Sequence, residues 1–132
     1  MRSNPLAAVV AAIAAFGSSV MQPAMAGTYP EKAVRVIVGL APGGGTDISA
    51  RVLTQKLSET LGQSFIVDNR PGAGSILGIE LAAKAPADGY TLLLGSAGPL
   101  AILPGMMKGL QYDPLRDFAP VALASSLPFL LV

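Results

Sequence analysis

The spacing of hydrophobic residues changes in the middle of the stretch from position 34 to 61. Residues 34–40 form a β-branched, apolar run of strand length, whereas the apolar residues after position 47 recur at helical spacing. Three glycines separate the two runs, and Thr46 or Asp47 is suited to cap a helix. The stretch predicts a strand, a glycine loop and a helix that ends at Gly62. On this helix, Ile48, Val52, Leu53, Leu57 and Leu61 are expected to face a sheet.

The same order of apolar run and glycine turn follows twice more. Short strands are predicted at residues 64–67 and 90–94, each followed by a glycine-bearing turn, and a helix at residues 76–84. This alternation favours an α/β fold, a parallel sheet with helices on both faces, in which the three turns lie together beyond the carboxyl ends of the strands. Further expectations are a short helix over residues 100–107 broken by Pro104, strands at residues 120–124 and 129–132, and Met106 and Met107 filling apolar gaps.

The glycine turns predict an anion site built from the backbone. Gly43, Gly44 and Gly45 have no Cβ, so their N–H groups are free to point at a ligand, and the following helix adds a partial positive charge. The candidate ligand-binding residues of the three turns are Pro42, Gly43, Gly44, Gly45, Thr46, Asp47, Gly72, Ala73, Gly74, Ser75, Ser96 and Ala97.

Each candidate also has a purely structural interpretation. The glycines can simply make tight turns, Asp47 can cap the helix, Ser96 can satisfy its own turn, and Arg70 can be a solvated or salt-bridged surface residue. Structural roles are assigned outright to Asp88, Tyr112, Asp113 and Asp117.

Residues 1–26 have the pattern of an export signal. Arg2 is followed by an apolar core at residues 6–16 and by Ala24-Met25-Ala26, which is typical of a cleavage site. A membrane anchor is the alternative, but the apolar run is short and is interrupted between residues 17 and 23. We therefore expect an exported protein whose mature chain begins near Gly27.

Composition excludes several classes of function. The chain is 52% hydrophobic with a mean hydropathy of +0.56, which excludes a disordered tail. Outside the export signal, eight basic residues balance eight acidic ones, and the whole chain has only seven aromatic residues, so nothing favours binding of nucleic acid. Because the chain has no Cys and no His, disulfides, nitrogen or sulfur metal sites and Ser-His triads are excluded. No enzymatic activity and no cofactor are expected.

Five ordered motifs stand out along the chain: Tyr29-Pro30-Glu31-Lys32, the turn at residues 41–47, Asn69-Arg70-Pro71-Gly72-Ala73-Gly74, the segment 85–93 and the segment 112–121. Together they resemble the Bug-type periplasmic binding proteins of tripartite tricarboxylate transporters. The resemblance covers the whole mature chain. It implies a two-domain periplasmic receptor that closes on a small carboxylate or dicarboxylate and presents it to membrane transporter subunits. It also implies that first-domain loops hold a ligand carboxylate through backbone N–H groups, small hydroxyl side chains and bridging waters.

The chain departs from the family pattern in three ways. Ser75 stands where a further glycine is frequent, and the third loop has Leu100 and Leu103 where the family commonly has polar residues. Members of the family are also more than twice as long, so we expect a truncated first domain with weak or no ligand binding. The expected organisation is a signal peptide at 1–26, the first α/β domain at 27–124, and the start of a crossover to a missing second domain at 125–132.

Two alternatives remain. Residues 34–54 followed by Asp68 imitate a dinucleotide-binding fold, which suggests a fragment of a nucleotide-dependent oxidoreductase, although Ile48 stands where the fingerprint needs a small residue. The other alternative is a gene fragment without function, because the chain stops within an apolar run at residues 129–132.

Overall fold

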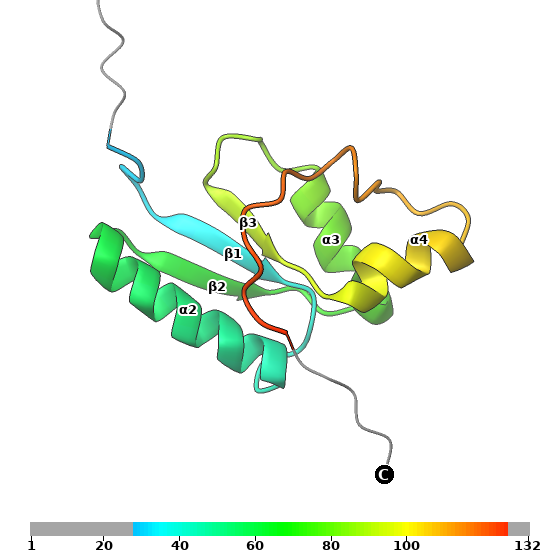
Figure 1. Cartoon of the computed structure of the whole chain (residues 1–132), viewed down its shortest axis with the longest axis horizontal. Coiled ribbons are helices and arrows are strands. Elements are labelled where there is room, and N and C mark those ends of the chain that lie inside the picture. Colours follow the sequence, from blue (N-terminus) through cyan, green and yellow to red (C-terminus); the bar gives the residue numbers. More distant parts are fainter. Residues whose placement is uncertain (1–27, 127–132) are drawn as a thin grey trace, which may run out of the picture.

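The computed structural model describes residues 28–126 of the 132-residue chain. The predicted export signal and the strand predicted at residues 129–132 lie outside this range. The described elements, in chain order, are β1 (Val34–Val38), α2 (Gly45–Leu61), β2 (Phe65–Asn69), the helical turn η1 (Ala73–Ser75), α3 (Ile76–Ala83), β3 (Thr91–Leu94), the helical segment η2 (Gly98–Ile102) and α4 (Leu103–Met106) (Figure 1). None of these helices has the length and hydrophobicity required to cross a membrane.

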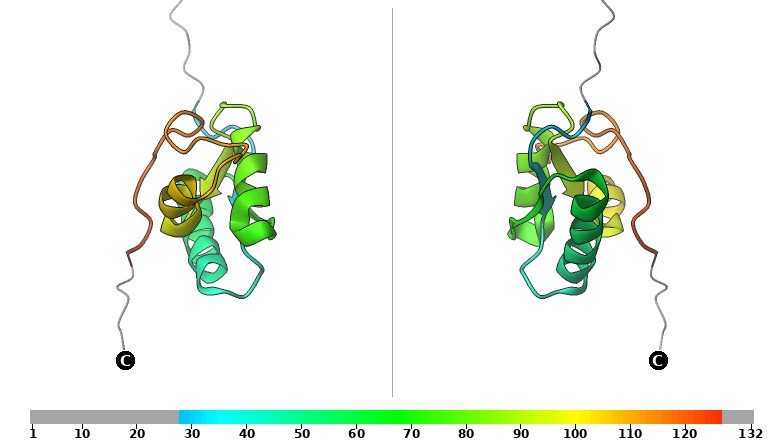
Figure 2. Two further views of the ribbon diagram at one scale, coloured as in Figure 1. Left: turned by 90° about the vertical axis from the view of Figure 1, so that its right-hand side faces the viewer. Right: turned by 90° about the vertical axis from the view of Figure 1, so that its left-hand side faces the viewer.

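The three strands form a parallel sheet in the order β2-β1-β3. The chain passes from β1 to β2 through α2, and then returns over β1 to reach β3 through α3. Because such crossovers are right-handed, steps in opposite directions place the two helices on opposite faces of the sheet. Accordingly α2 packs on β1 and β2, whereas α3 packs on β1 and β3, and the strands lie between the helices (Figure 2). The predicted fold class is confirmed.

Side chains of the central strand alternate between the two faces. Val34 and Val36 are buried with Phe65, and Leu57 of α2 packs against this cluster. On the face covered by α3, Ile37 and Ile79 are almost completely buried. The apolar residues of the central strand therefore supply the core on both sides of the sheet.

Helix α3 approaches the ends of β1 and β2 very closely. A Cβ at Gly78 would lie 2.8 Å from the Cα of Gly39 and 2.9 Å from the carbonyl oxygen of Arg70. Both of these atoms belong to the backbone and have little room to yield, so glycine at position 78 is what lets the helix rest against the loops.

Helix α2 does not bury the face that its hydrophobic spacing predicts. Ile48 and Val52 are 57% and 66% exposed. The side of the helix that faces the sheet instead consists of small or hydrogen-bonded residues, which let the helix lie close to β1 and β2. The buried residues of α2 are Asp47, Ala50 and Thr54; of the five predicted core positions only Leu57 packs into the core, while Leu53 and Leu61 are 39% and 40% exposed.

Several predicted element boundaries also shift. Gly44 is the N-cap of α2, so Thr46 and Asp47 lie in its first turn and neither is the cap. Gly62 ends the helix in a left-handed conformation with φ 70°, which confirms its predicted role. Strand β2 runs to Asn69, because Asp68 and Asn69 continue to pair with β1.

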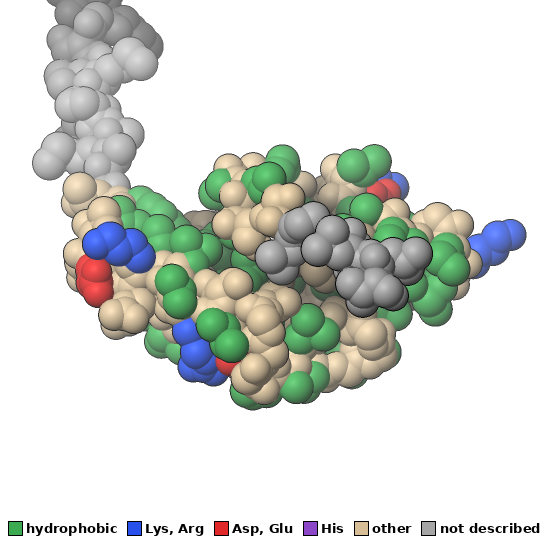
Figure 3. All heavy atoms as spheres, turned by 60° about the horizontal axis from the view of Figure 1, so that its bottom comes forward, with side chains coloured by type: hydrophobic (Ala, Val, Ile, Leu, Met, Phe, Trp, Pro, Cys, Tyr) green, Lys and Arg blue, Asp and Glu red, His purple; other side chains and the backbone are tan. Residues whose placement is uncertain are grey.

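The expectations for the C-terminal part of the chain are mostly wrong. The predicted helix begins at Gly98 and continues through Pro104, which is tolerated because it lies in the first turn of α4. Residues 120–124 form no strand, and Val121 and Leu123 are each 84% exposed. Met106 is 76% exposed and fills no gap. Among residues 28–126, no neighbouring element covers these side chains, and Figure 3 shows hydrophobic side chains scattered over one side of the molecule.

A cluster at the amino ends of the strands fastens the segment before β1. The rings of Tyr29 and Tyr90 lie 5.4 Å apart, and the Tyr29 hydroxyl donates to the Gly89 carbonyl at 2.7 Å. The Lys32 ammonium lies 4.3 Å from the centre of the Tyr90 ring and 3.8 Å from Asp88. Asp88 also accepts from the Tyr90 amide, in agreement with its predicted structural role.

The other residues that were assigned to structure make local contacts as well. The buried Tyr112 hydroxyl donates to the Pro99 carbonyl at 2.6 Å, and burial raises its pKa. Asp117 accepts from the amide of Asp113 at 2.7 Å. The Tyr112 bond fastens the irregular segment after α4 to η2, whereas the Asp117 bond closes a local turn within that segment.

Candidate ligand-binding site

A small crevice opens beyond the carboxyl ends of β1 and β3. The strand order reverses at β1, because the crossover from β1 leads to β2 on one side while β3 pairs on the other, and ligands of open α/β sheets bind near such a point. The cavity measures about 10 Å³, which is close to the space that one water molecule needs. It is lined by Gly39, Leu40, Thr46, Ser75, Ile79, Leu93, Leu94, Gly95, Ser96 and Pro99.

All three predicted turns contribute to this crevice. Thr46, Ser75 and Ser96 each bring a hydroxyl group, and they come from the loops after β1, β2 and β3 respectively. No charged side chain lines the cavity. The arrangement offers a ligand in the crevice neutral hydrogen-bond donors, together with the N-terminal end of α2.

The first loop is held by a buried carboxylate. Asp47 is only 2% exposed, and it accepts hydrogen bonds from the Gly43 amide and from Arg51 Nε, both at 2.9 Å, and from Asn69 Nδ2 at 3.0 Å. Asn69 Nδ2 also donates to the Leu40 carbonyl at 3.1 Å. The network thus joins the glycine loop, the first turns of α2 and the end of β2.

These contacts decide which loop amides remain available. The hydrogen bond from Arg51, followed by those from the Gly43 amide and Asn69, lowers the pKa of Asp47 to about 2. The Gly43 amide is therefore committed to a carboxylate that stays ionised. Within residues 28–126, no protein acceptor is found for the amides of Gly44, Gly45 and Thr46, as expected at the start of a helix.

The second loop has an unusual backbone. Ala73, Gly74 and Ser75 have φ values of 47°, 66° and 81°, so three successive residues are left-handed. Ser75 precedes α3 as its N-cap, yet its side chain makes no capping hydrogen bond. The loop is shaped by backbone conformation and by the contact of α3 with Gly39 and Arg70.

The structure separates the predicted site residues into groups. Thr46, Ser75 and Ser96 line the crevice, and Asp47 is buried beneath the first loop. Gly72 is half-buried, because a Cβ there would meet the Leu77 side chain at 2.4 Å. The remaining candidates are exposed outside the crevice: Pro42, Gly43, Gly44, Gly45, Ala73, Gly74 and Ala97.

Sequence reasoning missed part of the lining. Gly39 and Gly95 follow the last residues of β1 and β3 directly, and Leu40 and Pro99 complete the walls. Gly95, directly after a predicted strand, was a usable signal, whereas Gly39 lies inside the apolar run 34–40 that predicted the first strand. The supporting roles of Asn69 and Arg51 were missed as well, because they depend on a register that extends β2 to Asn69.

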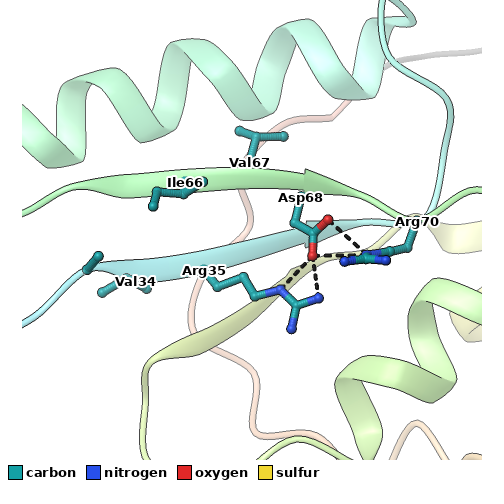
Figure 4. Close-up of a pocket in the computed structure, with 7 residues that line it drawn as sticks. Val34, Arg35, Ile66, Val67, Asp68 and Arg70 are labelled. Carbon is teal, nitrogen blue, oxygen red and sulfur yellow. Dashed lines mark hydrogen bonds and ion pairs between the residues drawn. The ribbon is translucent and has the colours of Figure 1, made fainter.

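A larger, shallow hollow of about 430 Å³ lies elsewhere, on the face of β1 and β2 opposite α2 (Figure 4). Its polar groups are satisfied by one another: Asp68 pairs with Arg35 and, at 2.9 Å, with Arg70. Arg70 is thus a salt-bridged surface residue, as predicted. Partial burial raises the pKa of Asp68, but the hydrogen bonds from Arg35 and Arg70 outweigh it and hold the pKa below its usual value. Because its charged groups are paired with one another, this hollow is not the candidate ligand-binding site.

Comparison with known proteins identifies the family. Residues 49–132 match the tripartite tricarboxylate transporter family receptor. The chain is 43% identical over 116 residues to protein BugT of Bordetella pertussis, covering 87% of this chain and 36% of BugT.

Two solved structures share the fold. The periplasmic binding protein BugD is 40% identical with a TM-score of 0.66, over 70% of this chain and 30% of BugD. MatC from Rhodopseudomonas palustris with bound malate is 40% identical with a TM-score of 0.69, over 73% of this chain and 33% of MatC. The chain spans about a third of the length of these relatives. With nearly two thirds of its residues inside the family match, the chain belongs to the tripartite tricarboxylate transporter receptor family.

Proposed function

We propose that this chain is a periplasmic solute-binding component of a tripartite tricarboxylate transporter, and that it binds a small carboxylated solute at the crevice between β1 and β3. Family membership supports a role as a transport receptor rather than an enzyme, and it does not favour the oxidoreductase alternative. The bound malate in the MatC structure supports a dicarboxylate as the class of solute.

One observation carries the proposal. The segments after all three parallel strands meet at one uncharged crevice, which is lined by the hydroxyl-bearing residues Thr46, in the first turn of α2, Ser75 and Ser96. A carboxylate oxygen is the size of group that fits there, and it accepts hydrogen bonds from neutral donors and helix amides. The amides of Gly44 and Gly45 extend the same surface outward for the second oxygen.

The affinity of this chain alone is expected to be low. The glycine loop is exposed, and the described residues contact a ligand from one side, so water competes for every donor. We expect a dissociation constant of roughly millimolar or weaker. Presentation of the solute to membrane transporter subunits, and export with removal of residues 1–26, are further parts of the proposal; N-terminal sequencing of periplasmic protein would test the cleavage at Gly27.

The first prediction is that Gly44→Val abolishes binding, whereas Arg70→Ala leaves it nearly unchanged. Gly44 has φ −79°, and a Cβ there would meet only the Ala41 carbonyl at 3.8 Å, so valine fits the fold while it covers the amides. Arg70 is already paired with Asp68, away from the crevice. NMR titration of the full chain with malate and citrate detects affinities in this range.

NAD provides the control for the alternative function. Chemical-shift changes with NAD, but with neither acid, would support the oxidoreductase alternative, and no change with any of the three would support a fragment without function. Loss of malate binding in Arg70→Ala, with retention in Gly44→Val, would contradict a site built from the backbone.

A further inference from the structure

Ser75 has a conformation that a residue with a side chain seldom adopts. Its φ of 81° and ψ of −5° lie in the left-handed region, where Cβ approaches the backbone too closely. A glycine would adopt this conformation without strain. Residues held in such conformations are concentrated at binding sites, where the surrounding structure compensates for the strain.

The side chain of Ser75 is enclosed and points to no partner. The residue is 6% exposed and lines the crevice. A Cβ at Gly39 would lie 2.7 Å from Ser75 Cβ, so the absence of a side chain at Gly39 makes room for the one at Ser75. Among the described residues, no side-chain hydrogen bond involves Ser75 Oγ, and because no fully buried side-chain oxygen there lacks a partner, this oxygen keeps some access to solvent.

The left-handed backbone explains why the hydroxyl stays unused. An N-cap serine normally has extended backbone angles, from which its Oγ accepts an amide of the first helical turn. Ser75 has left-handed angles instead and makes no such bond with α3. The hydroxyl therefore remains available in the crevice, beside Thr46 and Ser96.

We propose that Ser75 is a specificity-determining residue of the site assigned above: its hydroxyl donates to a carboxylate oxygen, and its side chain restricts the crevice to one such oxygen. This inference rests on the proposed function. Two features indicate that the Ser75 hydroxyl donates to an anion. No acidic side chain lines the crevice. Thr46, another lining residue, belongs to the first turn of α2, where the helix favours a negative charge. The restriction follows from the small cavity of about 10 Å³, one wall of which is Ser75.

Two substitutions separate the hydroxyl from the backbone strain. Ser75→Ala keeps the strained backbone and removes the hydroxyl, whereas Ser75→Gly removes both and widens the crevice. We expect each to weaken malate binding about tenfold, the effect of losing one hydrogen bond to a charged group. Ser75→Gly is also expected to raise the melting temperature, so its loss of affinity cannot come from unfolding.

The measurement is NMR titration of the full chain with malate, combined with thermal unfolding. Ser49→Ala, at an exposed position of α2 outside the crevice, is the matched control and is expected to bind like the unchanged chain. Unaltered affinity in Ser75→Ala and Ser75→Gly, with normal binding by the unchanged chain, would overturn the role of Ser75 and leave the proposed function intact. If the unchanged chain bound neither malate nor citrate, the proposed function would fail and this inference with it. Should Ser75→Ala not fold, Ser75→Gly decides.

Discussion

The first two loops at the carboxyl end of the sheet are held in place by different means. In the loop after β1, the buried Asp47 fastens Gly43 and connects to Asn69 and Arg51 through side-chain hydrogen bonds. In the loop after β2, no side-chain hydrogen bond reaches residues 71–75 within the described part of the chain, and four successive positive φ values define the path. One loop depends on an ionised group, the other on backbone conformation and close packing.

Because the two loops are held differently, different substitutions are expected to destabilise them. A buried hydrogen-bond network fails when one member is removed, because the remaining donors lose their acceptor while they are shielded from water. A backbone-defined turn responds instead to the conformational preference of each residue in it. The following predictions test this distinction, beginning with the largest expected effect.

Asp47→Ala is expected to lower the melting temperature strongly, on the order of 10 °C, because it leaves the Gly43 amide, Arg51 Nε and Asn69 Nδ2 without their acceptor. Thermal unfolding followed by circular dichroism measures the effect. Glu59→Ala is the control on the same helix, since Glu59 is exposed and pairs only with neighbouring side chains. Equal melting temperatures for the two variants would show that Asp47 does not hold the first loop.

Acid is expected to weaken the first loop selectively. Because the pKa of Asp47 is lowered to about 2 in the folded state, its contribution to stability is fully present above the unfolded pKa of about 3.9. It is lost as the pH falls from about 4 through 2. Urea unfolding at a series of pH values should show a steep loss in this window that Asp47→Asn makes shallower. Asp68 is retained in both proteins, so its own lowered pKa cancels in the comparison; identical slopes would refute the assignment.

Exchanging glycine and alanine should have opposite effects in the two loops. Ala73→Gly removes an alanine from a left-handed position and is expected to stabilise the chain by roughly 0.5 kcal/mol. Gly43→Ala introduces one at φ 87° and should destabilise by about 1 kcal/mol, although a Cβ there meets nothing within 4 Å. Urea unfolding at neutral pH measures both. Changes of the same sign would mean that contacts outweigh backbone preference.

The sequence was sufficient for the order of elements from β1 to β3 and for the meeting of the three turns, because apolar runs and glycines report strands and turns locally. It was misleading for α2. Helical spacing suggested that Ile48 and Val52 face the sheet, but the helix instead presents Asp47, Ala50 and Thr54, whose burial depends on partners such as Asn69 at the end of β2. Hydrophobicity alone does not show which buried polar residues find partners.

The site was predictable to a similar extent. The hydroxyl residues Thr46, Ser75 and Ser96 were among the candidates, since each lies in a turn after a strand. Most of the predicted glycines lie outside the crevice, while Gly39 and Gly95 line it, because of the packing between α3, η2 and the strand ends. Such packing leaves no local signature in one sequence.

The uncharged lining of the crevice has a consequence for the conditions under which it works. Its donors are hydroxyl and peptide dipoles, which do not ionise near neutral pH, so above the acid range in which Asp47 is protonated binding would follow only the titration of the solute itself. Dipolar fields also decay faster with distance than those of arginine or lysine, and they attract no layer of counterions that a ligand must displace. Binding at this crevice should therefore vary less with ionic strength than binding at a site built on arginine or lysine.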